Sequence, residues 1–105
     1  MLAARTSTLT GATQIDEGIK SFERETLPKL RAIAGFAGAT MHVDRQAKTV
    51  VATTYWDSME ALAASEKAAD ALRRTAAEKA GVTATPTVHR WECPVVTEIR
   101  VPAHA

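Results

Sequence analysis

Apolar and polar positions alternate along the chain with two different periods, and the changes of period mark six elements. The predicted strands are rich in Thr, Val and aromatic residues and cover residues 1–10, 37–45, 48–56 and 87–93. The predicted helices carry apolar residues at intervals of three and four and cover residues 15–33 and 57–80. The predicted order is therefore strand, helix, strand, strand, helix, strand.

The first predicted helix has one apolar stripe, made of Ile15, Ile19, Phe22, Thr26, Leu30 and Ile33. Thr13 stands three residues before Asp16, the arrangement of a side-chain N-cap. Pro28 falls late in the stripe and removes one backbone hydrogen bond. We therefore expect a kink or a separated last turn there, and an end at Gly35.

The second predicted helix begins at Asp57, which has capping-box spacing to Glu60, and runs unbroken to about Ala80 before Gly81. Its buried face is mostly alanine, with Met59, Leu62, Ala69, Leu72 and Ala76. Its solvent face carries Glu66, Lys67, Asp70, Arg73, Arg74 and Glu78. Such small buried side chains allow the helix to approach a sheet closely.

This order of elements predicts an α+β fold of ferredoxin-like βαββαβ topology, an antiparallel sheet with two helices on one face. We expect a single domain over residues 1–105, with a core at about residues 4–96 and an extended tail at residues 95–105 after Pro94. The second sheet face is too apolar to lie in water. A homodimer whose sheets close face to face into a barrel, with the tail reaching the partner, would cover it.

Composition narrows the choice of partner and compartment. Thirteen basic and 12 acidic side chains give a net charge of +1, so we expect neither nucleic acid nor membrane as a partner. Cys93 is the only cysteine, which excludes a disulfide within one chain. No apolar run approaches the roughly 18 residues of a spanning helix or resembles a signal peptide. The sequence therefore predicts a cytoplasmic protein.

Motifs for cofactors and hydrolytic chemistry are absent from the sequence. There is no glycine-rich phosphate loop, no G-x-S-x-G and no HExxH. The histidines have no spacing that demands a metal. We therefore expect no cofactor, no metal and no hydrolase triad.

Several segments together resemble the antibiotic biosynthesis monooxygenase family. They are Leu27-Pro28 followed by GFAG at residues 35–38, VATTYWDSMEAL at residues 51–62, and HRWE at residues 89–92. The resemblance extends from about Ala4 to Val96. It implies a dimeric α/β barrel with a pocket between sheet and helices. Some members oxidise polycyclic aromatic substrates with molecular oxygen and without metal or flavin.

Other members of that family degrade haem, with a Trp and a His on the second helix serving the haem pocket. Counted from Trp56, the matching positions here are Ser65 and Arg74. Neither residue can act as an axial haem ligand. The haem-degrading activity is therefore disfavoured.

Three residues are candidates for catalysis. His42 and His89 lie in predicted strands, and an imidazole is a suitable base for making an electron-rich substrate anion near neutral pH. The alternative for each is a structural or rim histidine. Tyr55 either donates its phenol proton to a substrate oxygen or fills the barrel between subunits.

Four residues are candidates for substrate binding. Trp56 either stacks on a flat substrate or packs under the second helix. Arg5 either holds an oxyanion or is a rim charge with its stem on apolar surface. Phe22 and Trp91 complete the set.

The leading functional hypothesis is a small-molecule oxidoreductase, a cofactor-independent monooxygenase acting on a phenolic or quinone-forming aromatic. The alternative is a non-catalytic dimeric module that binds a small hydrophobic or aromatic molecule or serves in stress. A pocket holding both a base and a donor would favour the enzyme, whereas a dry apolar cavity would favour the binding module.

Overall fold

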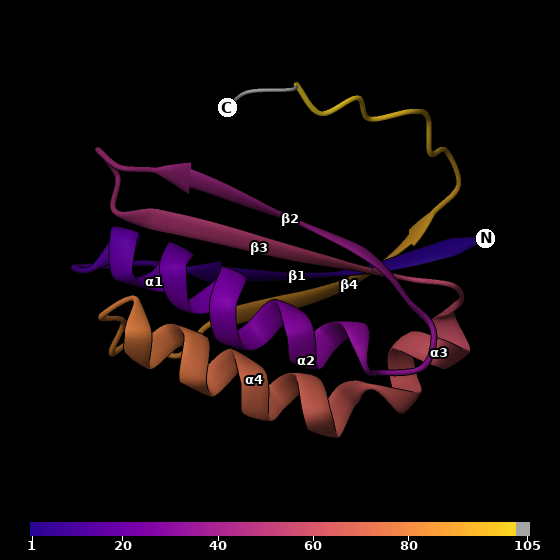
Figure 1. The fold of residues 1–105 in the computed structure, drawn as a ribbon, viewed down its shortest axis with the longest axis horizontal. Helices are drawn as coiled ribbons and strands as arrows, with labels where there is room; N and C mark the ends of the chain where they lie inside the picture. Colours follow the sequence, from indigo (N-terminus) through magenta and orange to yellow (C-terminus); the bar gives the residue numbers. More distant parts are fainter. Residues whose placement is uncertain (103–105) are drawn as a thin grey trace.

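A four-stranded antiparallel sheet carries the helices on one of its faces (Figure 1). The structure, a computed structural model, describes residues 1–102. The strands are β1 (Leu2–Leu9), β2 (Phe36–Asp44), β3 (Thr49–Trp56) and β4 (Thr87–Cys93), in the spatial order β2-β3-β1-β4. The predicted ferredoxin-like α+β fold is confirmed.

The register of the central strand decides which side chains face the helices. In β1, Arg5 lies opposite Thr54 of β3 on one side and Arg90 of β4 on the other. Because side chains alternate along a strand, the residues of β1 at odd positions and those of β3 at even positions point to the helices. The helix-facing residues of these two strands are Ala3, Arg5, Ser7, Leu9, Val50, Ala52, Thr54 and Trp56.

The first helical stretch is continuous but has a π-helical middle. It comprises α1 (Ile15–Ser21), η1 (Phe22–Thr26) and α2 (Leu27–Arg31). The irregularity that we expected at Pro28 lies in the turn before it, where the Leu27 N–H donates to the Phe22 carbonyl, five residues back. This wider turn accommodates the proline ring, which would clash with a carbonyl of a regular α-helix.

Thr13 does not cap this helix, contrary to the prediction. The N-cap residue is Gln14, which makes no side-chain cap hydrogen bond. The Thr13 hydroxyl instead donates to the Gly81 carbonyl at 3.2 Å. The hydroxyl therefore joins the start of the first helix to the end of the second.

The second helix is divided, not continuous as predicted. It comprises α3 (Met59–Ala64) and α4 (Glu66–Lys79), which meet at Ser65. The Ser65 hydroxyl donates to the Leu62 carbonyl at 2.7 Å, a local bond that competes with regular helix geometry. Ser58, not Asp57, is the N-cap and accepts the Ala61 N–H at 3.0 Å. Because of this start, Met59 is 43% exposed and lies outside the buried face.

The core between sheet and helices consists of two separate clusters. One contains Leu9, Ala12, Val50, Ala77, Ala80 and Val82. The other contains Ala3, Leu30, Trp56 and Leu62. They occupy opposite ends of β1 and β3, so the middle of the sheet–helix interface is filled by neither.

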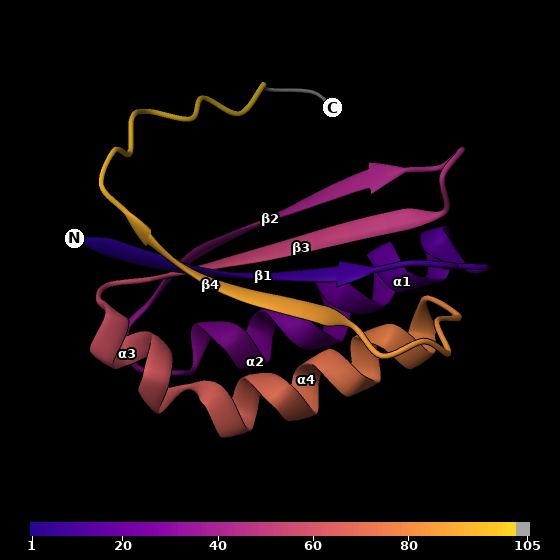
Figure 2. The ribbon, with the colours of Figure 1, turned by 180° about the vertical axis from the view of Figure 1, so that it is seen from behind.

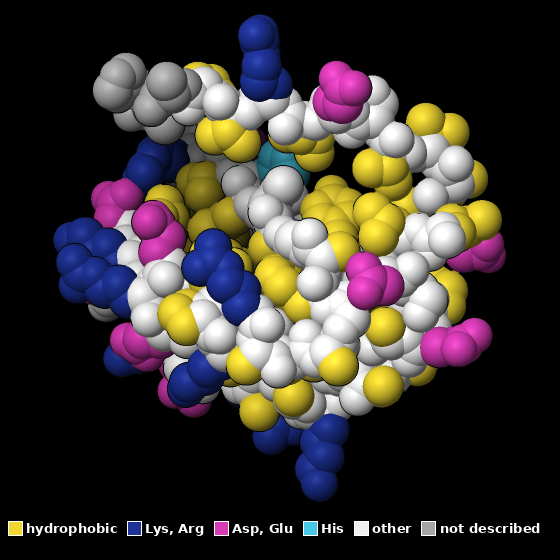
Figure 3. All heavy atoms as spheres, turned by 45° about the vertical axis from the view of Figure 1, so that its right-hand side comes forward, with side chains coloured by type: hydrophobic (Ala, Val, Ile, Leu, Met, Phe, Trp, Pro, Cys, Tyr) yellow, Lys and Arg dark blue, Asp and Glu magenta, His cyan; other side chains and the backbone are white. Residues whose placement is uncertain are grey.

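The other face of the sheet carries the C-terminal tail (Figures 1 and 2). In both views residues 94–102 run on the side of the sheet away from the helices. Figure 3 shows hydrophobic side chains and a histidine gathered in a hollow beneath this tail. Val95, Ile99 and Val101 of the tail are exposed. Within the described residues, no helix is long and apolar enough to cross a membrane.

We predict that Gly35→Ala destabilises the protein more than Gly11→Ala does. Both glycines have positive φ, +83° and +69°, where a side chain costs about 1–2 kcal/mol. A Cβ on Gly35 would also lie 2.6 Å from the Ala61 Cβ, whereas one on Gly11 meets nothing within 4 Å. The overpacking adds about 1–3 kcal/mol for Gly35→Ala. Urea unfolding of both variants measures the difference, and equal losses would contradict the close helix contact.

Candidate functional site

A cavity of about 60 Å³ occupies the unfilled middle of the sheet–helix interface. Its walls come from β1, β2, β3 and from both helical stretches. On the α4 side, the small side chains of Ala69, Ala76 and the C-cap residue Ala80 leave the space open. Most other lining residues are apolar, among them Leu9, Ile15, Phe22, Leu30, Met41, Val50 and Leu72. Two guanidinium groups, of Arg5 and Arg73, also line it.

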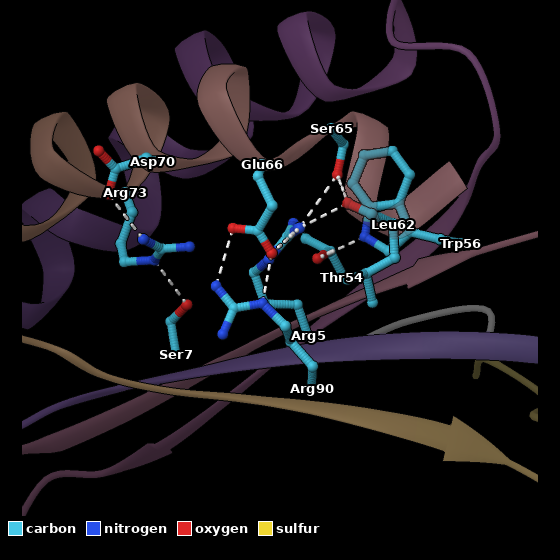
Figure 4. A network of polar contacts seen from close by, with 10 residues as sticks. All are labelled: Arg5, Ser7, Thr54, Trp56, Leu62, Ser65, Glu66, Asp70, Arg73 and Arg90. Carbon is cyan, nitrogen blue, oxygen red and sulfur yellow. Dashed lines mark hydrogen bonds and ion pairs between the residues drawn. The ribbon is translucent and has the colours of Figure 1, made fainter. Parts of the chain in front are cut away.

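Arg5 is a buried cation on the central strand, with only 2% of its surface exposed. Its Nη2 donates to the Leu62 carbonyl at 2.9 Å, to Ser65 Oγ at 3.1 Å and to Glu66 Oε1 at 3.0 Å (Figure 4). Its guanidinium carbon also lies 5.7 Å from the centre of the Trp56 ring, a cation–π distance. The remaining nitrogens, Nε and Nη1, are buried and have no hydrogen-bond partner among the described residues.

The alternative interpretation of Arg5 as a rim charge is wrong. The residue occupies a helix-facing position of the strand that is paired on both sides. A guanidinium at that position is stable only when a carboxylate and carbonyl oxygens meet it. The division of the second helix at Ser65 supplies both, since it presents the Leu62 carbonyl and the Glu66 carboxylate to Arg5.

Glu66 joins two arginines from neighbouring strands. Arg90 of β4 donates through Nε to Glu66 Oε1 and through Nη2 to Oε2, the latter at 2.8 Å, in a two-pronged contact. This hydrogen bonding to Arg90 is the main cause that lowers the pKa of Glu66 to about 2; burial opposes it, and Arg5 adds to the lowering. The carboxylate is therefore ionised across the physiological pH range.

Arg73 of α4 occupies the same region from the helix side. Its Nε donates to Ser7 Oγ at 3.1 Å, and its Nη1 donates to Asp70 Oδ1 at 3.0 Å. Its side chain is 12% exposed, and Nη2 is buried without a partner among the described residues. Burial, followed by the nearby charge of Arg5, lowers the pKa of Arg73. An arginine nevertheless stays charged at neutral pH.

Of the predicted substrate-binding residues, the structure brings Arg5 and Phe22 to the cavity wall. Trp56 is fully buried beside the cavity but does not line it. Its Nε1 donates to Thr54 Oγ1 at 3.0 Å, and its ring meets Phe36 edge-on at 5.6 Å. This packing, beside Leu62 of α3, matches the structural interpretation of Trp56.

The other four predicted residues, His42, Tyr55, His89 and Trp91, do not line this cavity. The strand register places them on the opposite sheet face, the one without helices. His89 and Trp91 lie side by side with ring centres 5.6 Å apart, and Trp91 Nε1 donates to Thr6 Oγ1 at 2.9 Å. One pocket that gathers all seven predicted residues is therefore not formed within a single chain.

Sequence reasoning missed Ser7, Ser65, Glu66 and Arg73. The sequence analysis places the last two on the solvent face because they are charged, although they lie four and eleven residues after the buried Leu62 and so share its helix face. A signal was present in the lone arginine of an otherwise uncharged first strand. An arginine that faces the helices from the middle of a sheet requires a carboxylate on the facing helix. In the part of the chain that the structure describes, no three His, Cys, Asp or Glu side chains gather as metal ligands.

Solved structures share this arrangement of sheet and helices over nearly the whole chain. The monooxygenase from the gene ActVA-Orf6 of Streptomyces coelicolor, in complex with nanaomycin D, aligns with a TM-score of 0.64 and 20% identity, covering 95% of this chain and 91% of that one. SnoaB, a cofactor-independent oxygenase from Streptomyces nogalater, aligns with a TM-score of 0.68 and 17% identity, covering 90% and 95%. Structures assigned to antibiotic biosynthesis monooxygenases match in the same way.

The chain has the antibiotic biosynthesis monooxygenase fold. At these identities the similarity shows the fold alone. No protein-family model matches the sequence. A sequence relative, the uncharacterised protein Rv2557 of Mycobacterium tuberculosis, is 34% identical over 90 residues, which are 85% of this chain. The chain spans 39% of that relative's length.

We predict that Glu66→Gln destabilises this monooxygenase-type fold at neutral pH and that the loss shrinks in acid. The pKa of Glu66 is about 2 in the folded state against an ordinary value of 4.5, so its stabilisation is complete above about pH 4.5 and is lost as the pH falls through 2. Because the carboxylate is 35% exposed, solvent screening limits the loss at pH 7 to about 1–2 kcal/mol.

Urea unfolding of the wild type and Glu66→Gln at several pH values measures this effect. Glu60→Gln on α3, where the carboxylate is exposed, is the matched control and should have little effect. A constant difference between wild type and Glu66→Gln from pH 7 to pH 2.5 would contradict the assignment.

Proposed function

We propose that the cavity between sheet and helices binds a small aromatic molecule and that the protein oxygenates it without a cofactor. The observation that carries this proposal is an apolar cavity at the centre of the fold whose polar groups are confined to a few side chains, chiefly Arg5, Ser7, Thr54 and Arg73. Ligand sites commonly combine an apolar wall with a few such polar groups. The relatives in fold support it, because one is a monooxygenase that holds nanaomycin D and another is a cofactor-independent oxygenase.

The size of the cavity limits how such a molecule enters. About 60 Å³ is well below the roughly 300 Å³ of a typical ligand pocket. A ring-sized ligand therefore enters when lining side chains change rotamer. Phe22, Met41 and Leu72 are half-buried and able to move, and the methionine is particularly adaptable.

The reaction we propose is the conversion of a phenol to a quinone. The ionised phenol gives electrons to O₂, a C–O bond forms on the ring, and the O–O bond breaks. One oxygen atom stays on the ring as the second carbonyl. The other leaves as water, which takes up the hydroxyl proton and the displaced ring hydrogen. The electrons lost by the ring reduce both oxygen atoms, so no further reductant is needed.

Binding without catalysis is the second candidate function. The observation that favours it is that none of the described residues lining the cavity is a His, Asp or Glu, so no obvious base faces the ligand. An enzyme would then have to select a substrate that is already ionised. Oxygen consumption separates the two functions.

We predict that 1-naphthol binds the protein and is converted to 1,4-naphthoquinone with uptake of one O₂ per molecule. Ala76→Leu should reduce both binding and turnover by about tenfold or more, because the added side chain occupies the cavity. Ala71→Leu, on the exposed side of α4, is the matched control and should leave both unchanged.

An oxygen electrode and isothermal titration calorimetry are the measurements for these variants. Binding of 1-naphthol that is lost in Ala76→Leu, without oxygen uptake in any variant, would support the non-catalytic function. Equal binding by Ala76→Leu and Ala71→Leu would contradict the cavity as the binding site.

We also propose that two chains pair through the sheet face without helices. Tyr55 and the half-exposed Trp91 lie on that face, and the adjoining tail exposes Val95, Ile99 and Val101. Figure 3 shows hydrophobic side chains gathered on this side of the molecule. A face of this composition gains from burial against a second copy. Such pairing would enclose His42 and His89 in the interface, which gives the predicted catalytic histidines a setting separate from the cavity.

We predict a mass of two chains in native mass spectrometry at micromolar concentration. Trp91→Lys should shift the protein to monomer, because it places a charge in the proposed interface. Met59→Lys changes an exposed apolar residue on the helix side and should leave the dimer intact. A wild-type monomer, or dimers in both variants, would contradict pairing through this face.

A further inference from the structure

The polar end of the cavity contains buried N–H groups that no described protein atom satisfies. They are Arg5 Nε, Arg5 Nη1 and Arg73 Nη2. Folded proteins rarely leave such donors unpaired, since each costs about 1–3 kcal/mol or more when charged. The two side chains come from opposite walls, β1 and α4, and both line the same cavity. Two other buried side-chain atoms without a partner, the hydroxyl oxygens of Ser21 and Thr40, belong to residues that do not line the cavity. Among the described residues, all the buried charged donors without a partner are therefore on the two arginines of its wall.

The same region carries more positive than negative charge. The guanidinium groups of Arg5, Arg73 and Arg90 are met by the carboxylates of Glu66 and Asp70, three cations against two anions (Figure 4). The negative charge of Asp70 is shared with a further arginine, because its other oxygen accepts from the exposed Arg74 at 2.7 Å. The excess positive charge lies where burial is greatest, since Arg5 is almost inaccessible and Arg73 nearly so.

We propose that this end of the cavity binds an anionic oxygen, so that the ligand is an anion with an apolar body: a carboxylate, a phenolate or an enolate. The oxygen would accept from the free N–H groups of Arg5 and Arg73. The body would extend along β1 toward Leu9, Val50 and Ala80, where the lining is apolar. Arg5 and Leu9 are four steps apart along the strand, a length of roughly 13 Å.

This inference rests on the proposed function only because it uses the same cavity. It also explains why the cavity can lack a base. Two buried guanidinium groups favour the ionised form of a bound phenol and therefore lower its pKa in the site. A phenol that binds as its anion needs no base within the cavity. The absence of His, Asp and Glu from the described lining residues then agrees with oxygenation.

Two probes that differ in charge but hardly in shape test the inference. We expect 1-naphthoate to bind at least about tenfold more tightly than 1-naphthamide in calorimetry at pH 7, because a hydrogen bond to a charged group contributes at least that much. Equal affinities would overturn the anionic site and leave the apolar cavity as a binding site. Failure of both probes to bind would count against the cavity itself and thus against the proposed function as well.

Variants of adjacent arginines locate the effect. Arg73→Gln should remove most of the preference for naphthoate, whereas Arg74→Gln, an exposed neighbour that also contacts Asp70, should keep it. Arg5→Gln should also reduce the preference for naphthoate. It also removes the hydrogen bonds from Arg5 to Leu62 and Ser65 and therefore affects folding. An undiminished preference in Arg73→Gln, with the fold intact by circular dichroism, would overturn the role of this end of the cavity.

Discussion

The burial of Arg5 is the constraint on which the rest of this structure depends. A guanidinium on the central strand, facing the helices, must find oxygen atoms or destabilise the fold. It finds them at the point where the second helix divides, in the Leu62 carbonyl, the Ser65 hydroxyl and the Glu66 carboxylate. Because Glu66 also accepts from Arg90, the same contact joins β1, β4 and the helix layer. The break in the helix thus supplies hydrogen-bond acceptors to a cation that is about 60 residues away in the sequence.

The cavity follows from the same arrangement. Ser65 and Glu66 point to Arg5 and do not fill the middle of the interface, and two of the α4 residues that line this middle, Ala69 and Ala76, have small side chains. The two apolar clusters therefore remain separate, with Leu9 and Val50 in one and Leu30 and Trp56 in the other. Packing at each end fixes the distance between sheet and helices. The space between the two clusters is the cavity, which is apolar except at the end where the arginines lie.

The fold could be predicted from the sequence because each helix and strand has a recognisable composition and spacing of apolar residues within its own segment. Strand composition, the apolar stripe of the first helix and the alanine face of the second indicate the order of elements, which limits the topology. The site depends on two features that the spacing of apolar residues does not contain: the non-local pairing register of β1 and the break at Ser65. Their charge alone indicated a solvent position for Glu66 and Arg73, although both share a helix face with the buried Leu62. Without the register, His42 and Tyr55 could not be assigned to a face.

One register also decides the chemistry of both sheet faces. Since side chains alternate, the pairing of Arg5 with Thr54 and Arg90 puts Arg5 and Ser7 at the cavity, and it puts Thr6, His89 and Trp91 on the other face. A slip of one residue would exchange the two sets and bury an unpaired imidazole beneath the helices. The Arg5–Glu66 contact opposes that slip, because only the observed register places the guanidinium against the carboxylate. The ion pair therefore stabilises the proposed ligand cavity and, through the same strand, the composition of the proposed dimer face.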